Sequence, residues 1–190
     1  YGGPIVRDLL AVYTTIVRAV PELILILILY FAFTSSINNL LLAWEFERIQ
    51  ISGFVAGIAV LGVVQGAYAT EVLRGAILSV PAGQIEAARA MGMPPLMLAW
   101  RVTFPQMLAA AIPGLANLWL IATKDTALLA VVGYAELTLV TRQAASTSKA
   151  YFTFFMAAGA MYLAISVLST LLFGRIEAWA RCGQVRPGGS

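Results

Sequence analysis

The chain has 190 residues, of which 61% are hydrophobic and only 11% are charged, and its net charge is +3. Soluble domains contain about 25% charged residues, so this composition indicates a protein that crosses a membrane several times. Because the chain contains no histidine, histidine catalysis is excluded. Cys182 is the single cysteine, which excludes an intrachain disulfide and a cysteine metal cluster. The sequence also lacks a GxxxxGK[ST] stretch, which excludes a P-loop nucleotide site.

The first predicted span covers about residues 11–34 and is centred on "AVPELILILILYFAF". Its alternating Leu and Ile are typical of a strand, but an open strand would leave backbone groups unsatisfied in lipid, so we expect a helix. Pro21 should kink this helix or mark an early turn. Because the chain starts at Tyr1 without a signal-like basic region, we expect it to be truncated at the N-terminus.

The second predicted span covers residues 53–72 and contains two pairs of glycines at a spacing of four, Gly53 with Gly57 and Gly62 with Gly66. Such spacing places small residues on one helix face and lets a second helix approach closely. Glycine is also simply common in membrane helices, so the pattern alone leaves both interpretations open.

A polar loop over residues 74–105 follows, and we expect two short helices in it. Gly83 and Gln84 begin the first, "QIEAARAM", and Gly92 is suited to end it because glycine readily adopts the left-handed conformation. The second runs through "LMLAWRVTF" to Pro105. Ala87 and Ala88 leave a smooth helix side for a partner, but composition alone favours a helix lying on the membrane surface.

The third and fourth predicted spans cover residues 106–133 and 151–175. The third is interrupted by Pro113–Gly114, Asn117 and the run Lys124–Asp125–Thr126. The fourth carries no charge from Tyr151 to Phe173, and its small residues predict a packing face. These small residues are Ala157, Gly159, Ala160 and Ala164.

The positive-inside rule places the 74–105 loop in the cytoplasm. With this orientation eight of the twelve basic residues are cytoplasmic, and three, Arg48, Arg142 and Lys149, lie on the opposite side, with Lys124 inside a span. The eight are Arg7, Arg18, Arg74, Arg89, Arg101, Arg175, Arg181 and Arg186.

The loop sequence "EAARAMGMPPLMLAWRVTFP" resembles the EAA motif of ATP-binding-cassette importer permeases, with Val102 and Phe104 in place of the usual Ile and Leu. The stretches "GAYATEVLRGAILSVPAGQIEAARAMG", "FPQMLAAAIPGLANLW" and "KDTALLAVVGYAEL" are similar to permeases of the polar amino-acid uptake family, over about residues 13–179. The stretch "RAVPEL", with Ala19 for the usual glycine, resembles most the Q-type subunits of histidine/lysine-arginine-ornithine and opine permeases.

This resemblance implies an all-α membrane protein with the type I ABC importer transmembrane fold, here one permease domain over residues 1–190 with four of five expected spans. It implies a cytoplasmic coupling helix, carrying Glu86, Ala87, Ala88 and Gly92, that sits in a groove of a separate ATPase. The implied partners are a second, similar or identical permease chain, two ATP-binding subunits and an extracytoplasmic solute-binding protein, in the bacterial cytoplasmic (inner) membrane. ATP and Mg²⁺ are expected in the ATPase, with neither cofactor nor catalytic site in this chain and no nucleic acid as partner.

Polar residues inside the spans are costly and mark a candidate substrate pathway. They are Asp125, Glu22, Asn117 and Lys124. Adjacent helical residues point about 100° apart, so Lys124 and Asp125 should face different surroundings. If the cargo is a basic amino acid, Asp125 or Glu22 is the natural counter-charge; charge compensation between helices is the alternative.

Three further charged positions are expected to be mainly structural. Arg18 could hold a cargo carboxylate, or else pack or anchor at lipid headgroups. Glu71 and Arg74 are three residues apart on one helix face and should pair. Glu136 is expected outside the membrane, as a solvated carboxylate or near a docking binding protein.

These observations predict the transmembrane subunit of an ATP-driven importer for polar, in particular basic, amino acids. The alternative is a stand-alone secondary transporter or channel, which would explain the spans and their charges equally well. It would not explain the long cytoplasmic loop with two short helices.

Overall fold

The computed structural model describes residues 3–47 and 52–180, and within them the ordered elements are all helices. Four residues named above lie outside the described ranges. They are Cys182 and three of the arginines counted for the orientation, Arg48, Arg181 and Arg186. The elements are α1 (Pro4–Ala19), α2 (Glu22–Ala43), α3 (Gly53–Leu78), α4 (Ala82–Ala90), α5 (Pro95–Leu98), the π-helix η1 (Ala99–Thr103), α6 (Phe104–Asp125), the 3₁₀ helix η2 (Thr126–Val132), α7 (Leu137–Ser148) and α8 (Tyr151–Ala180).

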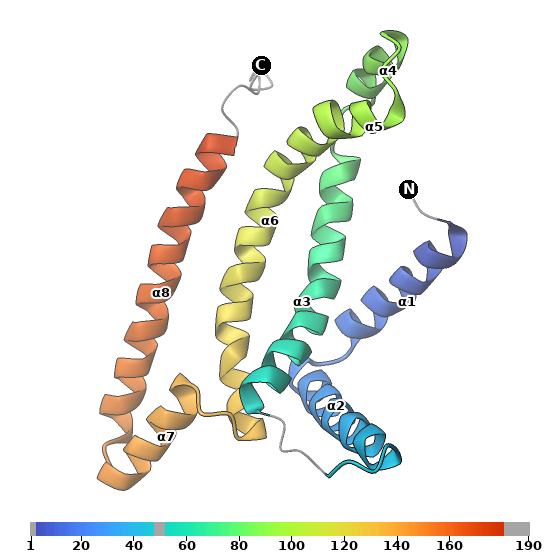
Figure 1. Ribbon diagram of the computed structural model, residues 1–190. Coiled ribbons are helices and arrows are strands. Elements are labelled where there is room, and N and C mark those ends of the chain that lie inside the picture. Colours follow the sequence, from blue (N-terminus) through green and yellow to red (C-terminus); the bar gives the residue numbers. More distant parts are fainter. Residues whose placement is uncertain (1–2, 48–51, 181–190) are drawn as a thin grey trace.

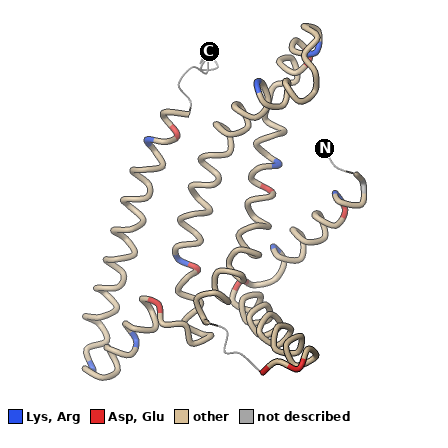
Figure 2. The backbone as a smooth tube through the Cα atoms, in the orientation of Figure 1, with Lys and Arg blue, Asp and Glu red and all other residues tan. Residues whose placement is uncertain are grey.

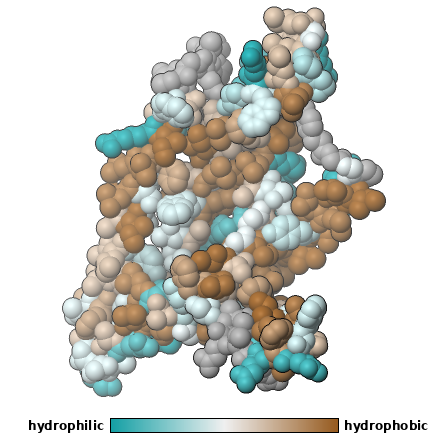
Figure 3. Space-filling model, viewed as in Figure 1, coloured by the Kyte–Doolittle hydropathy of each residue, from teal (hydrophilic) through white to brown (hydrophobic). Residues whose placement is uncertain are grey.

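Four helical segments of the described chain are long and apolar enough to cross a membrane, which confirms the predicted number. They are Glu22–Ala43, Gly53–Leu78, Pro95–Val132 and Tyr151–Ala180. In Figure 1, α3, α6 and α8 run side by side, with α4 and α5 at one end and α7 at the other. Large apolar side chains such as Phe152, 80% exposed, cover the outside of these helices (Figure 3), as expected for a surface that faces lipid or other membrane helices.

The first predicted span, 11–34, is wrong in its boundaries because the structure divides it into two helices. Helix α1 ends at Ala19, Val20 and Pro21 are extended, and α2 starts at Glu22 and continues to Ala43. A proline disfavours helical backbone in the residue before it and cannot donate a hydrogen bond, so the expected turn at Pro21 becomes a full break. Helix α1 therefore lies at a wide angle to α2 (Figure 1) and does not continue it. It packs against α3.

Of the three interruptions expected in the third predicted span, the structure contains only the one at Lys124–Asp125–Thr126, where α6 ends and η2 begins. Helix α6 passes through Pro113 and Gly114 without ending, and α5 and η1 lead straight into it, so the second short helix does not stop at Pro105. Pro105 lies in the first turn of α6, where a missing N–H is tolerated. The change of helix type comes at Asp125–Thr126, and η2 then ends at Gly133 in the left-handed conformation (φ 82°).

Helix α7 was not predicted, and its start is set by Glu136. The Glu136 carboxylate accepts hydrogen bonds from the backbone N–H groups of Thr138 and Leu139, both at 2.7 Å, and the Tyr162 hydroxyl of α8 donates to it at 3.3 Å. These bonds satisfy amide groups that a helix leaves free at its N-terminus. Glu136 is therefore a helix cap and not the freely solvated carboxylate expected from the sequence.

The core lies around α3, which α1, α2, α6 and η2 all contact. One buried cluster joins Val17, Leu25, Val64 and Ala67, and a second joins Ile26, Val60 and Leu129. On α8, Ala158 is buried, whereas the four small residues expected to form a packing face are exposed. That expectation is therefore wrong within this chain.

The two glycine pairs of α3 differ in what they contact. A Cβ on Gly57 would lie 2.7 Å from Leu129 Cδ1, and one on Gly53 would lie 3.2 Å from Tyr134 Cδ2. Gly66 lies under the Tyr13 hydroxyl, but nothing lies within 4 Å of the Cβ position on Gly62. The first pair is thus a site of close approach, and only one member of the second pair is.

Candidate functional site

Helix α4 forms the tip of the molecule at one end (Figure 1). Pro81 precedes it with extended backbone, and the helix has nine residues. Glu86 and Ala87 are exposed on it, whereas Ala88 is 4% exposed. Ala88 therefore packs against the chain itself, and of the two alanines only Ala87 is open to a partner.

The end of α4 follows the prediction made for Gly92. Its φ is +74°, its N–H donates to the Arg89 carbonyl at 2.9 Å, and the Met93 N–H donates to the Ala88 carbonyl at 3.1 Å. This pair of bonds is the Schellman motif, which requires a left-handed residue after the helix. Gly92 thus reverses the chain between α4 and α5, which starts at Pro95.

Two glutamines connect α4 to α6, a contact that sequence reasoning missed. The Gln106 amide donates to the Gln84 side-chain oxygen and also to the Val102 carbonyl, the latter at 3.0 Å. Leu98 of α5 is buried in the same region, at 3% exposure. Since α5, η1 and α6 are continuous, α4 is joined directly to a long transmembrane helix.

A charged cluster lies near the same end of α3. Arg74 Nη2 lies 2.6 Å from Glu71 Oε2, which confirms the predicted pair, and Arg18 Nη1 of α1 lies 3.8 Å from the same oxygen. Arg18 therefore joins α1 to α3 through Glu71, a contact between separate elements that local spacing could not reveal.

Deep in the helical bundle, Asp125 is 9% exposed and accepts a hydrogen bond from Gln65 Nε2 of α3 at 3.0 Å. Lys124 is exposed, so the two neighbours do face different surroundings, as the helix geometry predicts. Gln65 was not among the predicted site residues; its only signal in the sequence was a polar side chain within an apolar span.

Glu22 joins the same polar region through α3. The Tyr68 hydroxyl donates to Glu22 Oε1 at 3.3 Å. Tyr68 and Gln65 are three residues apart on α3 and so share one helix face. That face connects the first residue of α2 with the last residue of α6. We call Glu22, Gln65, Tyr68 and Asp125 the polar junction.

Asn117 does not belong to the polar junction. It is exposed, and it precedes Asp125 by eight residues, which is about 12 Å along a helix. Of the four residues predicted to mark a pathway, the structure therefore brings Glu22 and Asp125 into one region and leaves Asn117 and Lys124 at the surface of the chain.

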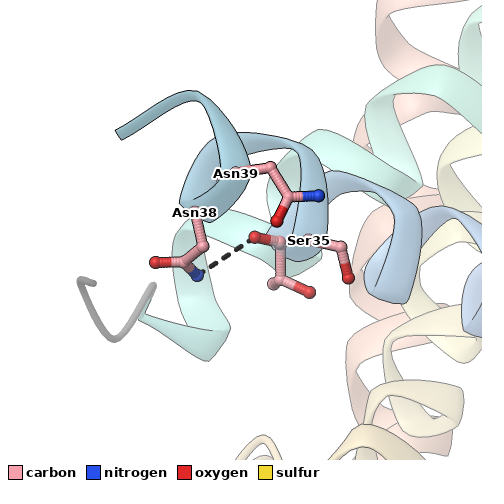
Figure 4. Close-up of a pocket in the computed structure, with 4 residues that line it drawn as sticks. Ser35, Asn38 and Asn39 are labelled. Carbon is pink, nitrogen blue, oxygen red and sulfur yellow. Dashed lines mark hydrogen bonds between the residues drawn. The ribbon is translucent and has the colours of Figure 1, made fainter. Parts of the chain in front are cut away.

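A second polar area lies on α2 and was also missed. Thr34, Ser35, Asn38 and Asn39 line a hollow of about 320 Å³ (Figure 4). Asn38 Nδ2 donates to the Thr34 carbonyl at 3.1 Å, and the Thr34 hydroxyl donates to the Tyr30 carbonyl at 2.8 Å. Polar side chains are disfavoured against lipid, so this face of the span is suited to contact water or another protein.

The charges of the described chain lie mainly near the two ends of the helices (Figure 2). Arg89 and Arg101 lie in or next to α4 and α5, whereas Glu45 and Glu47 follow α2 at the other end. Among the described residues, no group of three Cys, Asp or Glu side chains is placed to hold a metal ion.

The model of the family described as "binding-protein-dependent transport system inner membrane component" matches residues 1–181. The nopaline transport system permease protein NocQ of Agrobacterium fabrum is 42% identical over 175 residues, covering 90% of this chain and 74% of the relative. The arginine ABC transporter permease protein ArtQ of Escherichia coli is 34% identical over 186 residues, covering 91% and 78%.

Solved structures show the same arrangement of helices. A crystal structure of an amino acid ABC transporter with histidines matches with a TM-score of 0.72 and 28% identity, over 88% of this chain and 73% of that one. An inward-facing structure of the MetNI methionine ABC transporter matches with a TM-score of 0.73 and 20% identity, over 93% and 76%. The second match concerns the fold alone.

Proposed function

Since this chain belongs to the family of binding-protein-dependent transport system inner membrane components, we propose that it is the transmembrane subunit of an ATP-driven importer for basic amino acids and related opines. Helix α4 carries this proposal. It presents Glu86 and Ala87 at the tip of the molecule and is tied to α6 by Gln84 and Gln106. A partner that moves α4 would therefore move a transmembrane helix.

The proposed cargo is supported by chemistry and by the relatives. The relatives are named for the transport of nopaline, of octopine, of arginine, and of histidine, lysine, arginine and ornithine. The polar junction offers two carboxylates within the spans, Glu22 and Asp125, which suit a cationic side chain. Lys124 and Asn117 are exposed on α6 and are assigned to the wall of the pathway.

The mechanism follows from the continuity of α5, η1 and α6. A force on α4 reaches α6 through the Gln84–Gln106 contact and through the short connection after Gly92. Helix α6 ends at Asp125, where the backbone changes to 3₁₀ geometry. We assign to this point the change of access between the two sides of the membrane, because α6 connects the end of the molecule that carries α4 to the polar junction.

The assembly we propose contains a second permease chain, similar or identical, two ATP-binding subunits and an extracytoplasmic solute-binding protein. The family description names binding-protein dependence and an inner membrane component. ATP and Mg²⁺ bind in the ATP-binding subunits, and this chain contributes no catalytic group. Its part is to provide half of the pathway and to receive movement from the ATPase at the exposed Glu86 and Ala87, while the buried Ala88 and the left-handed Gly92 hold α4 in its orientation.

Deletion of residues 86–92 tests the coupling role. The variant should still insert into the membrane but should lose co-purification with the ATPase, together with ATP-dependent uptake. Because the deletion also removes the buried Ala88, Ala87→Trp provides a milder test: it adds bulk to an exposed position and leaves the packing of α4 intact.

The matched control is Ser146→Trp, at an exposed position of α7 at the opposite end of the molecule, which should keep ATPase binding. Full co-purification of both loop variants would show that α4 does not bind the ATPase. Uptake that stops when the proton gradient is collapsed, and that needs no ATP, would favour a stand-alone secondary transporter.

A further inference from the structure

The polar junction contains an acceptor atom without a donor. Gln65 Oε1 is fully buried and makes no hydrogen bond within the described chain. A buried polar atom left in this state costs about 1–3 kcal/mol, and inside a membrane protein water is scarce. The same amide group donates to the buried Asp125 carboxylate, so a hydrogen-bond partner for Oε1 at this place would lie next to that carboxylate.

The chemistry of the pair determines what that partner is. Gln65 Nε2 lies 3.0 Å from Asp125 Oδ2, and an ionised carboxylate only accepts hydrogen bonds. The amide must therefore turn its NH₂ group toward Asp125, which leaves Oε1 as an acceptor on the other side. The missing partner is thus a hydrogen-bond donor.

The surroundings favour a donor with positive charge. Asp125 and Glu22 both contact the Gln65–Tyr68 face of α3, and within the described residues neither carboxylate forms an ion pair with a lysine or an arginine. Tyr68 donates to Glu22 but carries no charge of its own at neutral pH. A guanidinium or ammonium group has several N–H donors and forms its strongest hydrogen bonds with carboxylates.

We propose that Gln65 determines cargo specificity, with Gln65 Oε1 and the Asp125 carboxylate together accepting hydrogen bonds from the cationic side-chain group of a basic amino acid. This inference rests on the proposed function and names the residue that recognises the charge. Gln65 has two roles in it: its NH₂ group orients Asp125, and its oxygen contacts the cargo.

The test is equilibrium binding of radiolabelled arginine and citrulline to the purified permease–ATPase complex, without the solute-binding protein. Citrulline has nearly the shape of arginine but a neutral urea group in place of the guanidinium. Gln65→Met keeps the length of the side chain and removes both the oxygen acceptor and the NH₂ group that donates to Asp125. Gln65→Glu, sharing one proton with Asp125, keeps an acceptor at the same place.

We expect Gln65→Met to weaken arginine binding tenfold or more and citrulline binding less than threefold. Gln65→Glu should retain most of the preference for arginine. The control Gln143→Met makes the same change at an exposed position of α7 and should leave both affinities unchanged. This selectivity for the charged ligand distinguishes recognition from a purely structural role.

Equal losses for arginine and citrulline in Gln65→Met, or no loss for either, would overturn the inference and leave Gln65 as a packing residue that binds water. A wild-type complex that transports arginine in reconstituted vesicles without binding it in this assay would overturn it as well. Failure of the proposed function looks different: the reconstituted wild-type system would then show no ATP-dependent uptake of basic amino acids or opines.

Discussion

Single glycines decide how closely α3 can approach its neighbours. A Cβ on Gly114 of α6 would lie 2.6 Å from Val72 Cγ1, and a Cβ on Gly57 of α3 would lie 2.7 Å from Leu129 Cδ1. Val72 is branched at Cβ and has few alternative rotamers, whereas Leu129 can turn its end away more easily. Gly114, which the sequence marks as an interruption, is therefore a contact point between two spans.

Gly114→Ala should destabilise the protein by about 1–3 kcal/mol, because the added methyl group forces α3 and α6 apart. Thermal unfolding of the purified protein in detergent measures the effect as a lower midpoint. Gly159→Ala is the control, since nothing lies within 4 Å of its Cβ position and alanine favours helix more than glycine. Equal midpoints for the two variants would show that α3 and α6 do not pack closely at Gly114.

Helix α4 is the element whose two ends are both held in place. At one end Gln84 contacts Gln106, and at the other the Gly92 and Met93 N–H groups bond back to α4 carbonyls. A nine-residue helix is too short to be stable on its own, so these tertiary and capping contacts maintain it. In the proposed mechanism this connection transmits a push on α4 to α6.

Gly92→Ala should weaken coupling without preventing insertion. The left-handed conformation costs a residue with a Cβ about 1–2 kcal/mol, so the Schellman turn and the orientation of α4 would be disturbed. We expect reduced ATPase co-purification and a lower rate of ATP-dependent uptake. Gly83→Ala, within α4 and with nothing near its Cβ position, should behave like the wild type. Unchanged uptake in Gly92→Ala would mean that this turn does not contribute to coupling.

At the scale of the whole molecule, the apolar middle and the charged ends define a membrane protein with two different faces. At the end of the molecule that carries α4 lie Arg89 of α4, Arg101 of η1, Arg74 near the C-terminus of α3 and Arg175 near that of α8, and at the opposite end lie Arg142 of α7 and Lys149 directly after it (Figure 1). Acidic residues occur at both ends. Positively charged residues are retained on the cytoplasmic side during insertion. The described part of the chain therefore favours the orientation inferred from the sequence, with α4 in the cytoplasm.

This orientation predicts which end of the protein a membrane-impermeant thiol reagent reaches. Cysteines are introduced separately at the exposed positions Ala82, in α4, and Ser146, in α7, after the native Cys182 has been replaced by serine. In right-side-out vesicles a charged maleimide should label Ser146→Cys only, and in inverted vesicles Ala82→Cys only. The opposite pattern would place α4 outside and contradict the coupling role.

The features that could be predicted from sequence depend on local interactions. The four apolar segments follow from composition, whereas the Glu71–Arg74 pair and the left-handed Gly92 each involve residues within one or two helical turns, so local spacing determines them. The break at Pro21 is likewise a local effect, although its size was underestimated. Helix α7 was missed because its mixed composition resembles a loop and its cap, Glu136, is not among the residues that usually begin helices.

Which residues pair with one another in the polar junction depends on the tertiary structure alone. Gln65 and Asp125 are 60 residues apart in the chain, and Tyr68 and Glu22 are 46 apart. Nothing in either local sequence shows which partner the other will meet, since this depends on how α2, α3 and α6 rotate and pack. Burial of several helices in one bundle brings such distant polar groups together, because a polar side chain that would be costly against lipid is stabilised by another one within the protein.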